Sequence, residues 1–419
     1  MIGLRKIDVA VIGAGPAGIA AAIGAREEGA ERVVVYERDW EPGGILQQCI
    51  HPGFGMHTFG SELTGPEYTH RYLQMAADAG VEFITNSMVF QMEKDGSFYV
   101  MNPERGIEHV TPGATVLCMG CRERPAGALP IAGSRPAGIY TAGTAQRFVN
   151  MEGFMPGKRV VILGTGDIGL IMARRMILEG ASVEGVFELM AWPGGLRRNI
   201  AQCLDDFKIP WFLEHTIVAI HGHDRVEGVT VAQVDKNREP IAGTYRRIAC
   251  DTLLLAVGLI PENELSRMAG VEICPETGGP RTDERFQTSI PGVFAAGNVA
   301  VVYDLVDWVS NGGRLAGKNA ARFAAGKLTP SARKICVTAG EGIRIVSPQQ
   351  FSGDKDVTLF FRVSHPFEKP CRLTAEPGIH SSVLRYARPG EMIELKLDSS
   401  KLQKISPETQ SIEICVKEM

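Results

Sequence analysis

The feature that most constrains this chain is a glycine pattern that occurs twice. Each copy has the spacing GxGxxG after a short apolar run, formed by Gly13, Gly15 and Gly18 in the first copy and by Gly164, Gly166 and Gly169 in the second. The offset is 151 residues (164 − 13), and it also relates Glu37 to Glu188 and the Pro-Gly-Gly turn at 42–44 to that at 193–195. One GxGxxG pattern is weak evidence, but two copies with a shared downstream acid indicate a duplicated unit.

The spacing of the glycines has a physical reason. In a strand-turn-helix unit the first glycine permits the tight turn, the second lets the backbone approach a pyrophosphate, and the third lets the helix pack closely on the strand. The helix then directs free amides and a favourable dipole at the anion. The apolar runs 7–12 and 160–163 predict the preceding strands. We therefore expect two adenine dinucleotide sites, with one true site and one decayed copy as the alternative.

An acid follows the second predicted strand of each copy. Glu37 comes directly after the apolar run 33–36, and Glu188 holds the equivalent place in the second copy. A carboxylate there accepts hydrogen bonds from ribose hydroxyls and repels a 2′-phosphate, so Glu188 favours NADH over NADPH. Arg197 and Arg198 lie close by in sequence and would oppose that preference.

Composition limits the function classes. With 419 residues the chain is long enough for two or three domains, and its net charge of −4 offers no electrostatic case for nucleic-acid binding. No apolar run approaches the length of a membrane span, and the apolar N-terminal segment is interpreted as a strand and not as a signal peptide. Nine scattered cysteines indicate reduced thiols and a cytoplasmic location, and no metal-ligand spacing is present.

The order of predicted elements indicates an α/β fold with two Rossmann-like three-layer domains, of which the first is discontinuous. We expect the first dinucleotide domain at 1–121, the second at 122–282, the return of the first at 283–328, and a small all-β domain at 331–419. Helices are expected at 67–79 and 304–325, and strands at 81–84 and 97–101 around the turn at Asp95-Gly96. The C-terminal domain has no nucleotide or metal pattern, and is expected to dock or to pack.

The order of motifs resembles the two-dinucleotide-binding flavoproteins, the thioredoxin reductase and glutathione reductase superfamily of pyridine nucleotide-disulfide oxidoreductases, over residues 6–326. The first copy matches the FAD site, the second matches the NAD(P)H site, and TSIPGVFAAGN at 288–298 matches the segment that passes the flavin's ribityl chain. The segments GGILQQCIHPGFG, CMGCRERPAGALPIAG, GIYTAGTAQRFVN and GDIGLIMARR resemble a narrower group. These are FAD/NAD-dependent subunits that accompany glycerol-3-phosphate or 2-hydroxyacid dehydrogenase-like flavoproteins, related to opine oxidase, proline dehydrogenase and hydrogen cyanide synthase subunits.

The resemblance implies two sets of cofactor-binding residues. For FAD these are Gly13, Gly15, Pro16, Ala17, Gly18, Glu37, Arg38, Gly43, Gly44, Val89, Met119, Gly120, Gly297, Asn298 and Asp304. For NAD(H) these are Gly164, Gly166, Asp167, Ile168, Gly169, Glu188 and Gly258. Two departures stand out. Asn298 replaces the aspartate of many members, and the redox dithiol is absent from both places where the disulfide reductases keep it.

Few residues are reactive enough to suggest chemistry. Cys49 and His51 follow the turn at 43–44, beside the flavin ring in the superfamily, and are the candidate catalytic residues; the alternative is that both are satisfied polar groups. Cys118 and Cys121 form a CxxC pair that we interpret as part of a tight turn at Gly120, with a cross-chain electron relay as the alternative.

The acids at the start of the last predicted helix, Asp304 and Asp307, are expected to cap that helix and to complement its dipole.

The leading hypothesis is an FAD-dependent, NAD(H)-linked oxidoreductase that serves as the electron-transfer subunit of a multi-subunit dehydrogenase. Its partners would be a flavoprotein dehydrogenase subunit, which oxidises a small hydroxy or amino acid or glycerol 3-phosphate, and a small cysteine-rich subunit. An oligomer or hetero-oligomer is therefore expected. Two alternatives remain open: a self-sufficient NADH oxidase or NADH:acceptor reductase, and a non-enzymatic flavin-bearing redox sensor or scaffold.

Overall fold

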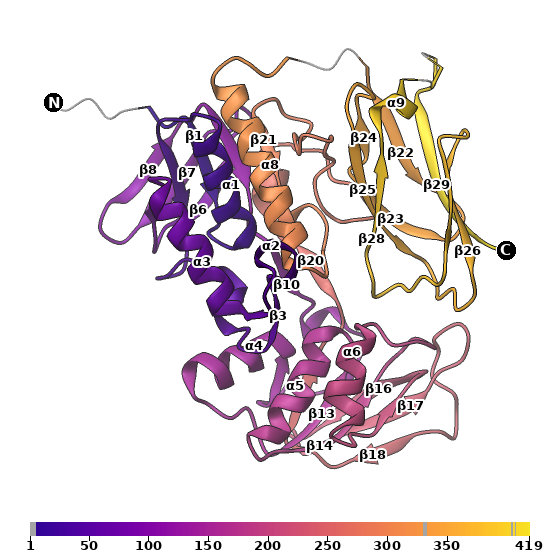
Figure 1. Cartoon of the computed structure of the whole chain (residues 1–419). Coiled ribbons are helices and arrows are strands. Elements are labelled where there is room, and N and C mark those ends of the chain that lie inside the picture. The colour runs from indigo at the N-terminus through magenta and orange to yellow at the C-terminus, as the bar shows by residue number, and fades with distance from the viewer. Residues whose placement is uncertain (1–5, 330–332, 404, 407) are drawn as a thin grey trace. The chain divides into compact units, whose positions relative to one another are not determined.

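The computed structural model of the chain describes residues 6–329, 333–403, 405–406 and 408–419, and it separates into two compact units (Figure 1). One unit comprises Met1–Cys121 with Pro261–Met419, and the other comprises Arg122–Ile260. The segment 261–282, which the sequence assigned to the second dinucleotide domain, belongs to the first unit. Its apolar residues Leu265 and Val271 lie in the same core cluster as Val34, and burial of these side chains holds the segment there.

The first unit is built on a five-stranded parallel sheet. Its order is β21-β9-β1-β2-β5, and the strands are β1 (Val9–Ile12), β2 (Val33–Tyr36), β5 (Glu82–Ile84), β9 (Ala114–Leu117) and β21 (Val293–Ala295). Every residue of β1, β2 and β9 is buried. This explains why these strands are continuous apolar runs, since a parallel sheet is covered on both faces.

The two faces of this sheet are covered differently. Helices α1 (Pro16–Glu27) and α8 (Val306–Ala324) pack together on one face, as Figure 1 shows, and α3 (Gly65–Asp78) contacts α1. The opposite face packs against an antiparallel meander of β6 (Met88–Met92), β7 (Phe98–Asn102) and β8 (Gly106–Val110). Short elements complete the region: η1 (Gly44–Gln48), β3 (Pro52–Phe54), α2 (Met56–Phe59), β4 (Leu63–Thr64), α7 (Glu264–Met268) and η5 (Gly297–Val299).

The second unit repeats this plan. Its parallel sheet has the order β12-β19-β13-β14-β15, and the strands are β12 (Ile139–Thr141), β13 (Arg159–Leu163), β14 (Ser182–Phe187), β15 (Trp211–Phe212) and β19 (Thr252–Leu255). One face is covered by α4 (Ala142–Arg147) and α5 (Asp167–Leu178). The other carries a four-stranded sheet of β11 (Ala132–Gly133), β16 (His215–His221), β17 (Gly228–Gln233) and β18 (Arg246–Ile248). The duplication in sequence is thus a duplication of architecture.

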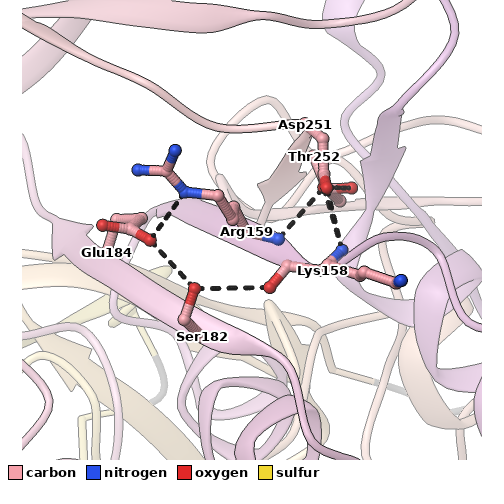
Figure 2. Close-up of polar contacts among 6 residues, drawn as sticks. All are labelled: Lys158, Arg159, Ser182, Glu184, Asp251 and Thr252. Carbon is pink, nitrogen blue, oxygen red and sulfur yellow. Dashed lines mark hydrogen bonds and ion pairs between the residues drawn. The ribbon is translucent and has the colours of Figure 1, made fainter.

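Polar side chains close the amino end of the second parallel sheet (Figure 2). The carboxylate of Asp251 accepts hydrogen bonds from the amides of Lys158 and Arg159 and from the hydroxyl of Thr252. The guanidinium of Arg159 pairs with Glu184 at 3.2 Å. These contacts connect the strands at the end of the sheet opposite the glycine loop, which follows β13 at the carboxyl end.

The C-terminal part forms two antiparallel-rich sheets that share one core. The larger sheet has the order β24-β22-β29-β26-β27, with β22 (Ile335–Ala339), β24 (Gln350–Phe351), β26 (Cys371–Glu376), β27 (His380–Leu384) and β29 (Ser411–Glu418). The smaller has β23 (Ile343–Ser347), β25 (Val357–Val363) and β28 (Ile393–Leu397). A four-residue helix, α9 (Ser399–Leu402), is the addition to the expected all-β part.

The α/β class and the two Rossmann-like sheets are therefore confirmed. The strand expected at 97–101 is β7, but its partners are β6 and β8, whereas the strand expected at 81–84 is β5 in the parallel sheet. Alternation alone did not separate the two sheets, because both contribute apolar residues to one core. Across the described residues, no helix combines the length and apolar character that crossing a membrane requires.

Candidate functional site

The first glycine loop joins β1 to α1, and its three glycines have different surroundings. Gly13 has φ +100°, and a methyl group built on it would lie 2.5 Å from the carbonyl oxygen of Cys118. A methyl group on Gly18 would lie 1.8 Å from the carbonyl oxygen of Gly13. At Gly15 no atom of the described residues lies within 4 Å on that side. Backbone therefore fills the space at the first and third glycines, whereas the middle one faces room for a ligand.

The second loop, between β13 and α5, divides its glycines in the same way. Gly164 has φ +98°, and a methyl group on it would lie 2.2 Å from the carbonyl oxygen of Ala256. At Gly169 the nearest atom is the Cβ of the same alanine at 2.6 Å, whereas at Gly166 the nearest atom is 3.5 Å away. Helices α1 and α5 begin one residue after the open glycine, so their unpaired amides point toward that space.

The two acids repeat the same contacts with their loops. Glu37, at the end of β2, accepts a hydrogen bond from the amide of Ala14 at 2.7 Å, and Glu188, at the end of β14, accepts one from the amide of Thr165 at 2.9 Å. Each acid also accepts an amide two residues further on, at 2.9 Å in the first unit and 3.0 Å in the second. Both carboxylates are buried. They are therefore held beside the open glycine, where a ribose would lie.

The Pro-Gly-Gly turns lie against the glycine loops. In the first unit the amide of Gly43 donates to the carbonyl oxygen of Ala14 at 2.8 Å, and Gly44 approaches the Cα of Gly15. In the second unit the amide of Gly194 donates to the hydroxyl of Thr165 at 2.9 Å. Each turn thus forms a second wall of the space above the middle glycine.

Segments distant in sequence complete the first site. Gly297 has φ +76°, and a methyl group on it would lie 2.7 Å from the Cβ of Ala17 in α1. Gly120 follows β9 with φ +72° and has open space, as does Gly258, with φ +102°, in the second unit. Asn298 accepts a hydrogen bond from the amide of Tyr303 at 3.0 Å. The carboxyl ends of β1, β9 and β21 therefore gather Gly120, Gly297 and Asn298 at one edge of the first sheet.

The remaining predicted positions differ in what their side chains can contact. Pro16 and Ala17 begin α1, as Asp167 and Ile168 begin α5, and Met119 lies against the first loop. Arg38 is exposed next to the buried acid. Val89 is buried in β6 within the core, so its side chain has no open face toward a ligand.

The family follows from this arrangement together with a direct comparison. Residues 7–322 match the model of the pyridine nucleotide-disulphide oxidoreductase family. The chain belongs to this family. It is 26% identical over 287 residues to hydrogen cyanide synthase subunit HcnB of Pseudomonas protegens, covering 64% of this chain and 60% of that protein. It is 28% identical over 322 residues to an opine oxidase subunit from Agrobacterium tumefaciens, covering 70% and 61%. The chain thus spans about three fifths of the length of these relatives.

A solved structure supports the same fold. Lactococcus lactis thioredoxin reductase superposes with a TM-score of 0.63 at 22% identity, covering 77% of this chain and 100% of that one. Members of this family are oxidoreductases that bind FAD and NAD(P)H. The residues present fit both groups, because each unit has an open glycine at a helix start and a buried acid beside it.

Cys49 and His51 lie in the segment after the first Pro-Gly-Gly turn. The Cys49 thiol donates to the carbonyl oxygen of Ile45 at 3.2 Å, and burial raises its pKa to about 12, so it is a protonated thiol at neutral pH. His51 Nδ1 is 3.1 Å from the carbonyl oxygen of Pro52, and its ring packs against Phe54. A protonated thiol is a poor nucleophile, so these contacts suit hydrogen bonding near a cofactor better than covalent chemistry.

Cys118 and Cys121 are not joined, and none of the nine cysteines, all of which lie in the described ranges, forms a disulfide. Cys118 follows β9, is buried, and has its pKa raised to about 12 by that burial. Cys121 begins β10 (Cys121–Glu123), where the side-chain amide of Asn298 approaches its sulfur at 3.7 Å. Since the backbone of Cys118 contacts Gly13, its place in the fold is that of a packing residue under the glycine loop.

The acids near the start of α8 do not cap the helix. Leu305 occupies the N-cap position, and within the described part of the chain no side chain caps it. Asp304 instead accepts the amide of Met392 from the C-terminal part at 2.8 Å, and Asp307 accepts both the amide and the hydroxyl of Thr58 in α2. The expectation of capping was therefore wrong, because these carboxylates accept hydrogen bonds from distant segments and the N-cap position belongs to Leu305.

The C-terminal part makes hydrogen bonds and ring contacts with the segment that leads into α8. Arg362 is buried and donates to the carbonyl oxygens of Val302, Pro389 and Gly390 at 3.3, 3.1 and 2.6 Å. The ring of Phe360 packs on Tyr303 at 5.4 Å and on Trp308 at 5.2 Å. No sequence pattern marks these residues, since they lie in a region without a motif and contact partners some sixty residues away.

Proposed function

We propose that this protein is an FAD-dependent, NAD(H)-linked oxidoreductase that serves as the electron-transfer subunit of a multi-subunit dehydrogenase. The observation that carries the proposal is the repeated contact between an acid and a glycine-loop amide, Glu37 with Ala14 and Glu188 with Thr165. Both loops keep the open middle glycine, which supports two intact dinucleotide sites over one site and a decayed copy. FAD is assigned to the first loop and NAD(H) to the second.

The chain's residues would bind and orient the two cofactors. The amides at the start of α1 and α5 would hold the pyrophosphates, and the buried acids would hold the adenosine riboses. When bound in the first unit, FAD would supply the redox chemistry for hydride exchange with NAD(H). Gly120, which has positive φ and open space beside it, would let backbone approach the flavin closely, whereas Gly297 lets its segment pack against Ala17 of α1. No side chain needs to take up a proton for this transfer, so Cys49 and His51 are proposed to tune the flavin's surroundings.

The absence of a dithiol supports a partner protein as the electron donor or acceptor. None of the nine cysteines in the described ranges forms a disulfide, and the thiols of Cys49 and Cys118, whose pKa values burial raises to about 12, are protonated at neutral pH. The relatives named above are described as subunits of larger enzymes. We propose a partner flavoprotein that oxidises a small hydroxy or amino acid or glycerol 3-phosphate, together with a small cysteine-rich subunit.

An anaerobic titration of the FAD-loaded protein tests the cofactor assignment. Adding NADH, and separately NADPH, while following flavin absorbance should give stoichiometric bleaching with NADH and weaker bleaching with NADPH. Glu188→Gln should weaken the response to NADH while the protein keeps its FAD, and Glu37→Gln is the matched variant that should lose FAD. No bleaching of the wild type by either nucleotide would contradict the proposal.

A second experiment tests the complex. The protein, affinity-tagged and expressed from its native host, should purify with a partner flavoprotein dehydrogenase, and alone it should turn over slowly with oxygen or quinones. Rapid NADH turnover by the isolated chain would support a self-sufficient reductase instead. NADH-dependent assembly without turnover to any acceptor would support the scaffold alternative.

A further inference from the structure

The two acids that mark the riboses are equivalent in position but not in the number of hydrogen bonds they can still accept. An ionised carboxylate has two oxygens with about four acceptor positions in total. On Glu37, one position of Oε2 is taken by the amide of Ala14 and one of Oε1 by the amide of Asp39. Each oxygen therefore keeps one position, which suits the two neighbouring hydroxyls of a ribose.

Glu188 has less capacity because of the residue in its glycine loop. Its Oε2 accepts both the amide of Thr165 at 2.9 Å and the hydroxyl of Thr165 at 2.6 Å, and its Oε1 accepts the amide of Met190 at 3.0 Å. Oε2 is thus fully used, and one position remains on Oε1. The first unit has Ala14 at the equivalent place, which has no hydroxyl to offer.

The threonine hydroxyl is locked in this role. Thr165 is fully buried, and while its hydroxyl donates to Glu188 it accepts the amide of Gly194 from the Pro-Gly-Gly turn at 2.9 Å. Rotation of the side chain away from Glu188 would remove one of the two hydrogen bonds to Oε2 and would leave the amide of Gly194 without this acceptor, which costs free energy. The hydroxyl therefore stays on Oε2.

We propose that Thr165 is a specificity-determining residue that limits ribose recognition in the second unit to one hydroxyl. This inference rests on the proposed function, in which the second unit binds NAD(H). Under it the first unit holds the adenosine ribose of FAD through both hydroxyls, whereas the second holds that of NAD(H) through one. The additional hydroxyl contact would contribute roughly ten-fold to the affinity of the first unit for its dinucleotide relative to the second.

Nucleotide analogues test this in the wild-type protein without any substitution. Binding of NADH, 2′-deoxy-NADH and 3′-deoxy-NADH, with the deoxy change in the adenosine ribose, would be measured by anaerobic calorimetry on the FAD-loaded protein, with its flavin reduced beforehand so that no hydride is transferred during the titration. A hydrogen bond to a charged group is worth roughly ten-fold in affinity. One analogue should bind roughly ten-fold more weakly than NADH, and the affinity of the other should lie within about two-fold of that of NADH.

Substitution of Thr165 distinguishes this role from a purely structural one, because the two roles predict opposite changes in the affinity for NADH. Thr165→Val fills the same volume without the hydroxyl, frees the second position of Oε2, and should bind NADH several-fold more tightly while both analogues bind weakly. The turn stays anchored because Asp167 accepts the amide of Leu196 at 2.8 Å and the side chain of Asn199 at 2.7 Å. Thr165→Ser keeps the hydroxyl and should match the wild type.

The outcomes separate the two proposals. If the wild type binds NADH but loses affinity with both analogues, or if Thr165→Val binds NADH equally or more weakly, the role of Thr165 is overturned while the proposed function stands. If the FAD-loaded wild type does not bind NADH at all, the proposed function and this inference both fail.

Discussion

Helices α1 and α8 of the first unit pack closely together, and this packing depends on glycines. Methyl groups built on Gly24, Gly313 and Gly317 would lie 2.1, 2.2 and 1.8 Å from carbonyl oxygens of the facing helix. Real Cβ atoms essentially never approach another atom within 3.0 Å. Gly317→Ala therefore requires α1 and α8 to separate by about 1.2 Å (3.0 − 1.8) along the line to the carbonyl oxygen of Ala21.

The cost of that separation follows from packing energetics. A radial gap of about 0.5–1 Å already loses a quarter to a half of the dispersion energy of a contact. Overpacking of a close-packed site costs about 1–3 kcal/mol or more, and here the obstacle is backbone, which cannot rotate away. Replacing glycine by alanine within a helix returns about 1 kcal/mol. We expect Gly317→Ala to lower the free energy of unfolding by about 2 kcal/mol and to weaken FAD retention, because α1 begins at the glycine loop.

Urea denaturation followed by circular dichroism, with the flavin-to-protein absorbance ratio, measures both effects. Gly312→Ala is the matched control, since it lies on the same helix and gains the same helix propensity. Its new methyl group would meet the ring of Phe286, a side chain, at 3.0 Å. The control should lie within about 1 kcal/mol of the wild type. A Gly317→Ala protein with the same free energy of unfolding and the same flavin-to-protein absorbance ratio as the wild type would refute the role of this close helix packing.

Three further predictions concern stability. Burial, and to a smaller extent the charge of Glu284, raises the pKa of Asp283 from 3.8 to about 6. The protonated carboxyl therefore contributes to the free energy of unfolding fully below pH 4, and this contribution is lost as the pH rises through 6. The advantage of Asp283→Asn should therefore grow over that window by at most about 3 kcal/mol in urea titrations, and a pH-independent difference would contradict this. Burial alone would raise the pKa of Asp251, but hydrogen bonds from Thr252 and two backbone amides hold it below its usual range, so its stabilisation is lost as pH falls. Asp251→Asn should cost about 1 kcal/mol at pH 7 and less at pH 3, and a larger cost in acid would be the wrong sign. Arg362→Met removes the donor to three carbonyl oxygens. The C-terminal part of this variant should be cleaved in limited proteolysis at protease concentrations that leave the wild type intact. Equal resistance of the two proteins would show that these hydrogen bonds do not hold the C-terminal part on the segment before α8.

The sequence predicted what depends on local chemistry. The strands before each GxGxxG loop, the helices after them and the acids at 37 and 188 follow from turn geometry and apolar runs within about 25 residues, and the structure has each of them. The resemblance to the flavoprotein superfamily is confirmed by the family match over 7–322. The catalytic roles of Cys49 and His51 stay predictions, because they depend on a ring that the sequence does not position.

The tertiary structure decided the contacts between distant segments. Asp304 looked like a helix cap, yet the amide of Met392 arrives from 88 residues away, and Asp307 is taken by Thr58 from 249 residues away. Such pairings depend on which backbone groups the folded chain brings within 3 Å, and no local pattern encodes that distance. The sequence alone determined that two dinucleotide units exist. Only the fold decided how many hydrogen bonds each acid can still accept, because that number depends on a neighbouring hydroxyl, a buried turn and the packing that locks both in place.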